Sequence, residues 1–424
     1  MAGSKLTAKE QENLNRAITG EITNAHAAKQ LRLSIRQVQR AKIRLRLNGS
    51  VGIVHKLKGK PSNHQLDDSL KEKTLKLVKE KYTDFKPTFA AEILQEIHSL
   101  TINPQTLRRW MVGAGLWKER KEKHKSEHRS WRSRKENFGE LVQFDGSYHY
   151  WFEKRFVDQF GSPIEVCLLA AIDDATGKIT RAQFAANEGV EAVFIFWKEY
   201  VEEIGKPLSI YLDKFSTYKI NHKAAVDNHE LMTQFQRAMQ DLDILLIPAH
   251  SPQAKGRVER LFDTLQDRLV KELRLAKIDT PEGGNTFLKK VFIPKFNNKF
   301  AVIPAKEGDI HRELTKTDKQ HLNRIFSVQK SRKVNNDFTI QFKNKWYQLA
   351  EIQPTTLRAK EKVTVEEWLD TSLHLSLREK YLKYLKLPER PKKAPSSPII
   401  ITGHKLNWKP PVDHPWRKYP KANT

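Results

Sequence analysis

The order of apolar runs between residues 138 and 280 is the feature that most constrains the fold of this chain. Three strand-like runs come first, and helical and extended patterns then alternate to the end of the region. The expected strands cover 141–148, 164–173, 178–186, 208–213 and 243–249, and the expected helices cover 191–205, 229–242 and a segment that opens at 251. This alternation predicts a mixed sheet with helices on its faces.

Three strands followed by helix, strand, helix, strand and helix is the element order of the ribonuclease H-like fold. We therefore expect a multidomain α/β protein with N-terminal helix-turn-helix modules, a central ribonuclease H-like mixed sheet with flanking helices, and a C-terminal small β-barrel with an extended tail. The expected divisions are a helix-turn-helix domain (1–55), a second helical, helix-turn-helix-like domain (56–117), a basic linker (118–137), the catalytic core (138–280), a connecting segment (281–324), the small β-barrel (325–370), and a helix with a Pro-rich tail (371–424).

Three acidic residues occupy related places in this order. Asp145 interrupts the first apolar strand, Asp213 ends the fourth, and Glu259 lies one to two turns into the helix after the fifth. In a ribonuclease H-like sheet the first and fourth strands are neighbours and this helix packs across their ends, so the three carboxylates would meet. Taken singly, Asp145 could be a strand-end turn residue and Asp213 a helix cap.

The helix that opens at residue 251 supports this placement of Glu259. Ser251 can cap it and Pro252 suits its first turn. One apolar stripe follows at helical spacing: Val258, Leu261, Phe262, Leu265 and Leu269. Glu259 lies roughly 100° from the centre of this stripe, on a shoulder shared with Lys255 and Gln266. Asp263 and Asp267 point further out and are expected to be surface charges.

Clustered carboxylates repel one another unless cations neutralise them. Hard oxygen ligands favour Mg²⁺, or Mn²⁺, over zinc. Two such ions about 4 Å apart can activate a water or a 3′-hydroxyl for phosphoryl transfer. Asp145, Asp213 and Glu259 are thus predicted both as metal ligands and as catalytic residues.

Other polar residues near these acids have simpler explanations. Asp173 and Asp174 lie in DDATGK between two expected strands, where Asp and Gly commonly form a turn, and we assign them to that turn. His149 and His250 flank the predicted site. Either could position a substrate, and a hydrogen-bonded structural histidine is the alternative for both.

The charge of the chain points to a polyanionic partner. Its 76 Lys and Arg exceed its 50 Asp and Glu, for a formal net charge of +26, which favours nucleic acid first and an anionic membrane second. No apolar run approaches the ~20 residues that span a bilayer, and no signal-peptide core opens the sequence, so we expect a cytoplasmic protein. The single cysteine, Cys167, excludes an intrachain disulfide and a cysteine-based zinc site.

Residues 7–47 predict three short helices, with Thr23 and Ser34 as N-caps. The third would turn Ile35, Val38 and the stem of Lys42 inward, in the manner of a recognition helix. A plain three-helix bundle with a basic surface remains the alternative. In the second module, Asn103 would cap a helix that starts at Pro104. The predicted DNA-contacting residues are Arg36, Gln37, Gln39, Arg40, Arg108, Arg109, Lys255 and Arg257.

Several stretches carry a family resemblance: FGELVQFDGSYHYWFE, AAIDDATGKI, IYLDKFSTYKIN and IPAHSPQAKGRVERLFDTLQDRLVKELRL. They resemble the integrase-core transposases of bacterial insertion sequences, close to the ISNCY group. The resemblance implies a DDE-type site, with Asp145 and Asp213 matching the two aspartates and Glu259 the glutamate. It implies an enzyme that binds the terminal inverted repeats of its element, cleaves the 3′ ends and joins them to target DNA as a homodimer or larger oligomer. The alternative is a catalytically silent or domesticated DNA-binding regulator of the same fold.

After the core, short alternating runs with Asn and Asp turns predict the small β-barrel. In similar integrases such a barrel binds DNA, and a structural appendage is the alternative. A helix is expected around 371–386, followed by a Pro-rich tail that cannot pack as regular structure.

Overall fold

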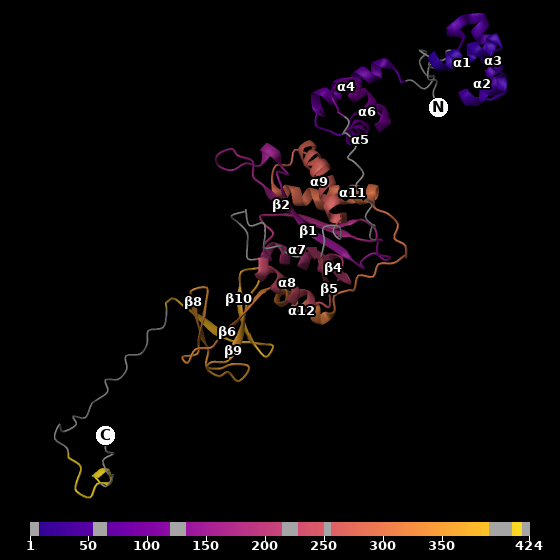
Figure 1. Cartoon of the computed structure of the whole chain (residues 1–424). Coiled ribbons are helices and arrows are strands. Elements are labelled where there is room, and N and C mark those ends of the chain that lie inside the picture. Colours follow the sequence, from indigo (N-terminus) through magenta and orange to yellow (C-terminus); the bar gives the residue numbers. More distant parts are fainter. Residues whose placement is uncertain are drawn as a thin grey trace. The chain divides into compact units, whose positions relative to one another are not determined.

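The computed structural model describes residues 8–53, 66–118, 133–213, 228–249, 256–389 and 409–417 (Figure 1). The chain divides into two compact units, Met1–His124 and Lys125–Thr424. Within the described ranges, no helix combines the length and the apolar composition needed to cross a bilayer.

The first unit begins with three helices, α1 (Ala8–Thr19), α2 (Asn24–Leu31) and α3 (Ile35–Asn48). The predicted caps are confirmed, because Thr23 accepts a hydrogen bond from His26 N–H and Ser34 forms a capping box with Gln37. The prediction that Ile35 points inward is wrong, since this side chain is 49% exposed. Ile35 is the first residue of α3, one turn before the buried Val38, and its side chain extends past the small core.

Three further helices follow in the same unit: α4 (Asp68–Lys81), α5 (Pro87–His98) and α6 (Pro104–Gly113). They enclose a core that contains Phe85, Phe89, Leu94, Ile102, Leu107 and Met111. Asn103 accepts a hydrogen bond from Gln105 N–H and Pro104 is the first residue of α6, as predicted. The Asn103 side chain accepts from a backbone N–H of the first turn that has no partner within the helix. Proline has no backbone N–H, and the first helical residue does not need one because it has no intrahelical acceptor.

The second unit contains the predicted mixed sheet, with strand order β3-β2-β1-β4-β5. Its strands are β1 (Val142–His149), β2 (Val166–Asp173), β3 (Ile179–Ala185), β4 (Ser209–Asp213) and β5 (Leu245–Ala249). The first three pair antiparallel, and β4 and β5 run parallel to β1. This is the ribonuclease H-like arrangement that the element order predicted.

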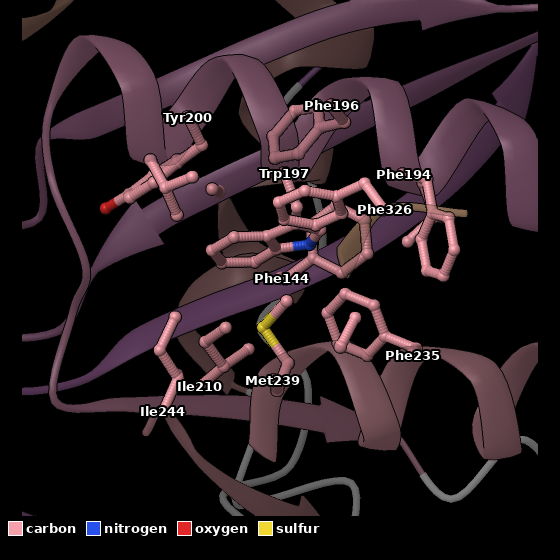
Figure 2. Close-up of a cluster of buried hydrophobic side chains, with 14 of the residues drawn as sticks. Phe144, Phe194, Phe196, Trp197, Tyr200, Ile210, Phe235, Met239, Ile244 and Phe326 are labelled. Atoms are coloured by element: carbon pink, nitrogen blue, oxygen red, sulfur yellow. The ribbon is translucent and has the colours of Figure 1, made fainter. Parts of the chain in front are cut away.

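Helices cover both faces of this sheet. On one face, α7 (Val190–Glu203) and α8 (Asn228–Asp241) pack over an aromatic core in which Trp197 lies among Phe144, Phe196 and Tyr200 (Figure 2). On the other face, α9 (Gly256–Leu275), α10 (Pro281–Phe287), a π-helical turn (Leu288–Phe292) and α11 (Ile293–Phe300) contribute to a second core. All five residues of the predicted α9 stripe are buried. The expected capping by Ser251 lies outside the described residues.

The C-terminal region forms two antiparallel sheets around one apolar core. The first, in the order β11-β10-β9-β6, comprises β6 (Val328–Lys333), β9 (Lys362–Glu367), β10 (Leu373–Leu377) and β11 (Lys380–Tyr381). The second comprises β7 (Thr339–Phe342), β8 (Lys345–Leu349) and β12 (Tyr384–Leu387). The sequence predicts a small β-barrel over 325–370; the structure has two antiparallel sheets here, and they continue to residue 387.

The helix expected around 371–386 is wrong, because these residues form β10, β11 and β12. Leu373, Leu375 and Leu377 recur at every second position and contact the apolar core, which is the period of a strand. Arg378 and Glu379 both have positive φ, of 52° and 63°, and they make the tight turn that pairs β10 with β11.

A buried ion pair joins the connection between α7 and β4 to α12 (Lys316–Ile325). Lys206 Nζ lies 2.7 Å from Asp318 Oδ2, and the two side chains are only 6% and 15% exposed. Burial raises the pKa of Asp318, but hydrogen bonds from Lys206 and Thr315 outweigh it and leave this pKa below its ordinary value. A carboxyl whose pKa is lower in the folded than in the unfolded state stabilises the fold at pH values above the unfolded-state pKa. This stabilisation is lost as the pH falls through the folded-state pKa.

We therefore expect Asp318→Asn to lower the free energy of unfolding by about 3–5 kcal/mol near neutral pH, because Lys206 loses its buried partner. Urea denaturation followed by circular dichroism measures this. The difference from the parent protein should shrink in acid, where the parent also loses the charge of Asp318. Equal stability at neutral pH would show that the ion pair does not support α12.

Candidate active site

The parallel pairing of β1 with β4 brings two of the predicted acids to neighbouring positions. Val142 is paired with Ile210 and Gln143 with Tyr211. Asp145 lies two residues beyond Gln143, and Asp213, the last residue of β4, lies two residues beyond Tyr211. The paired positions end at Gln143 and Tyr211. Adjacent strands are about 4.8 Å apart, so the same register continued for two residues would set the backbones of Asp145 and Asp213 side by side. The side chain of Asp213 lies outside the described part of the structure.

Helix α9 lies along the same face of β1. Val142 and Phe144 belong to the aromatic core, so strand alternation places Gln143, Asp145 and Ser147 on the opposite face. Gln143 Oε1 accepts a hydrogen bond of 3.2 Å from Val258 N–H. Gln266 Nε2 donates one of 3.2 Å to Ser147 Oγ. These two contacts make α9 run beside β1 in the same direction, with Asp145 midway between them.

Glu259 belongs to the face of α9 that meets β1. It precedes Gln266 by seven residues, which at 3.6 residues per turn is a rotation of only about 20°. The side chain of Glu259 is exposed, and among the described side chains none forms an ion pair with it. It lies in the first turn of α9, where the helix dipole favours negative charge. The carboxylate is thus open to solvent and available to a cation.

These observations fit a site for hard divalent cations. Asp145 on β1 is half-buried and Glu259 on α9 is exposed. Both carboxylates can supply oxygen ligands to such a cation. Among the described side chains, which do not include that of Asp213, no group of three His, Cys, Asp or Glu has metal-binding geometry. Asp145 and Asp213 lie on neighbouring strands, and Glu259 lies on α9, the helix that contacts β1.

A buried polar cluster fixes the start of α9 against β1. Asp174, with no exposed surface, accepts hydrogen bonds of 2.8 Å from both Gln143 Nε2 and Arg257 NH1. Its other carboxylate oxygen accepts one of 2.9 Å from Lys135 N–H. Asp173 accepts from Thr176 N–H and Gly139 N–H, and burial raises its pKa. Asp174 lies in the turn as predicted, whereas Asp173 is the last residue of β2 and accepts hydrogen bonds at the start of that turn; the turn also anchors α9.

The structure places the other predicted residues as follows. Arg257, expected to contact DNA, has a side chain only 16% exposed and pairs with Asp174. Lys255 and His250 lie outside the described residues. His149 packs edge-on against the buried Trp151. Burial lowers the pKa of His149, partly offset by Glu165 and Glu153, which favours the structural alternative for this residue.

Sequence reasoning missed Gln143. Its side chain is fully buried and connects β1 to both Asp174 and α9. The sequence does indicate a buried polar contact at this position, because an amide side chain between Val142 and Phe144 in an apolar strand requires hydrogen-bond partners. The sequence did not indicate which partners these would be.

The side chains of α3 that are predicted to contact DNA are exposed. Arg36, Gln39 and Arg40 are exposed while Val38 between them is buried. Gln37 is also exposed, but its amide oxygen accepts Ser34 N–H at 2.8 Å in the capping box. On α6, Arg109 is exposed and Arg108 half-buried.

A mixed five-stranded sheet of this order, with acids on β1, at the end of β4 and on α9, the helix after β5, defines an integrase-type catalytic core, the fold of DDE-type enzymes. Sequence relatives agree. "Putative transposase y4bF" of Sinorhizobium fredii (strain NBRC 101917 / NGR234) is 41% identical over 344 residues, which cover 81% of this chain and 73% of that protein. The "Transposase for insertion sequence IS1202" of Streptococcus pneumoniae is 28% identical over 437 residues, with 94% and 90% covered. The chain belongs to the transposases of bacterial insertion sequences, and it is a DDE-type enzyme.

Among solved structures, the chain matches the HTLV-2 integrase catalytic core domain in complex with magnesium, at 16% identity and a TM-score of 0.26, covering 35% of this chain and 82% of that one. The simian T-cell lymphotropic virus intasome matches at 13% identity and a TM-score of 0.30, covering 74% and 100%. No family model matches the chain. The family assignment rests on the sequence relatives.

We expect Arg36→Ala combined with Arg40→Ala to weaken binding to the DNA ends of the element by about 1–3 kcal/mol for each base that these side chains recognise. Fluorescence anisotropy at two salt concentrations measures the affinity. Unrelated DNA of equal length is the control, because removing a side chain that binds only phosphate weakens both DNAs equally and reduces the salt dependence. Unchanged affinity for both DNAs would remove α3 from the DNA interface.

Proposed function

We propose that this transposase binds the terminal inverted repeats of its insertion sequence, cleaves the 3′ ends and joins them to target DNA. Asp145, Asp213 and Glu259 would hold two Mg²⁺ or Mn²⁺ ions and carry the reaction. The observation that supports this most strongly is the register of β1 and β4, whose continuation by two residues would align Asp145 with Asp213, together with the packing of α9 along β1.

The geometry gives each carboxylate a distinct part. Asp145 and Asp213 stand on neighbouring strands of a rigid sheet, and rigid elements hold ligands more reproducibly than loops. Glu259 completes the set from a helix and faces solvent, where a DNA strand can approach. When bound, two divalent ions supply an activated water or 3′-hydroxyl and stabilise the leaving oxygen of an in-line displacement. The chain's own residues keep the three carboxylates together despite their mutual repulsion.

The remaining parts of the chain would hold DNA. The helical modules 1–55 and 56–117 would bind the element ends through α3 and α6, and the basic segment 118–137 would lie along phosphates. The C-terminal sheets are a further DNA-contact candidate. Because a transposase handles two DNA ends, we expect a homodimer or larger assembly on DNA. These divisions, and membership of the ISNCY group, stay predictions.

A catalytically silent regulator of the same fold is the second candidate function. All three acidic residues are present in the sequence, which favours the enzyme. A regulator would bind the element ends without cleaving them in any divalent metal, so a cleavage assay with and without chelator separates the two.

The sharpest test compares two acids one turn apart on α9. Glu259 and Asp263 are both exposed, but only Glu259 is assigned to the site. We expect Glu259→Gln to reduce Mg²⁺-dependent cleavage of the element ends by about 10²–10³-fold, as loss of a group that stabilises transition-state charge does. Asp263→Asn should retain most of the activity.

Asp145→Asn should behave as Glu259→Gln does, and both variants should bind the ends with parental affinity. Cleavage is followed on supercoiled DNA that carries the ends. A Glu259→Gln variant as active as Asp263→Asn would show that the assigned site is wrong.

A further inference from the structure

We propose that Gln143, Asp174 and Arg257, here called the Asp174 brace, are positioning residues that set the affinity of the active site for divalent metal. The brace would act by holding Glu259 at a fixed distance from Asp145. The inference rests on the proposed function, since it takes both carboxylates as metal ligands.

The brace connects the two elements that carry these carboxylates. Gln143 lies two residues before Asp145 on β1, and Arg257 lies two residues before Glu259 on α9. Asp174 Oδ1 accepts 2.8 Å hydrogen bonds from both side chains. The Gln143 amide also accepts Val258 N–H at 3.2 Å, so its two ends link the β2–β3 turn to the backbone residue that precedes Glu259.

The brace is buried and its geometry is constrained. Gln143 and Asp174 have no exposed surface, and the Arg257 side chain is 16% exposed. A buried carboxylate must be matched by donors, and here they come from three separate segments, because Lys135 N–H supplies the third. Any shift of α9 along β1 would break at least one of these bonds.

The position of Arg257 is otherwise unfavourable. It lies at the N-terminus of α9, where the helix dipole disfavours a cation. Its ion pair with Asp174 offsets this and turns the guanidinium inward. Arg257 therefore orients the first turn of α9, in which Glu259 is the acidic residue.

Residues that orient metal ligands without touching the metal typically change metal affinity by about 10–100-fold when replaced. The brace would have this effect because Glu259 lies in the first turn of α9. Without the brace, this turn could shift relative to β1 and change the distance between Glu259 and Asp145. Asp145 is fixed in the centre of the sheet and needs no such support.

The test compares two ion pairs at opposite ends of α9 in the full chain. Asp174→Asn with Arg257→Met removes the charges of the brace together, so that neither is left buried alone. The control is Glu153→Gln with Arg274→Met. It removes an Arg274 Nε–Glu153 Oε2 pair of 3.2 Å near the C-terminal end of α9, together with the 3.6 Å contact of the same oxygen with Arg155. Arg257→Lys is the conservative variant, which keeps the charge but not the planar guanidinium.

Two readouts are needed. The first is the dissociation constant for Mn²⁺, measured by calorimetry without DNA, and the second is the Mn²⁺ concentration that gives half-maximal cleavage. We expect both to rise by about 10-fold or more in the brace variant, by less in Arg257→Lys, and not at all in the control. Cleavage should recover at high Mn²⁺, and end binding without metal should be unchanged.

Parental Mn²⁺ affinity in a folded brace variant would overturn the inference, as would an equal loss in the control pair. If the double variant does not fold, the Mn²⁺ dissociation constant of Arg257→Lys is compared with that of the parent, and equal values would overturn the inference. Failure of the proposed function looks different, because Asp145→Asn and Glu259→Gln would then bind Mn²⁺ as the parent does.

Discussion

The parallel pairing of β1 with β4 is the interaction on which the rest of the site depends. These strands are separated in the sequence by β2, β3 and α7, yet backbone hydrogen bonds set them in one register. Because side chains alternate along a strand, a slip of one residue would place position 145 or 213 on the wrong face. The aromatic core resists such a slip, since Val142, Phe144, Ile210 and Leu212 are all buried on its side of the sheet.

The core is predictable from the sequence because its signals are local. Apolar runs locate all five strands, and the stripe of α9 identifies the buried face of that helix. The same reasoning locates Asp145 and Glu259 on the correct elements. It does not find the connection through Gln143, Asp174 and Arg257, because each of these bonds joins residues more than thirty positions apart. The expectation of a DNA contact for Arg257 arises because a basic residue near a helix start gives no sign of a buried partner.

The C-terminal region shows where local patterns mislead. Residues 371–386 are rich in Leu and Lys, which favour helices, and the turn between β10 and β11 contains no Gly or Asn. Instead Arg378 and Glu379 adopt positive φ. The alternating leucines decide the outcome, because a strand buries all of them against β9 and its neighbours whereas a helix would spread them around its axis. In this region, tertiary packing outweighs intrinsic propensity.

The central claim is that Asp145, Asp213 and Glu259 together bind divalent metal. The most direct measurement is anomalous X-ray diffraction from crystals of the transposase grown with Mn²⁺. The account predicts manganese peaks next to the ends of β1 and β4, with carboxylate oxygens of all three residues at about 2.0–2.2 Å, the range of compact octahedral ions. Manganese bound elsewhere, or bound to the two aspartates with Glu259 turned away in the presence of DNA, would contradict it.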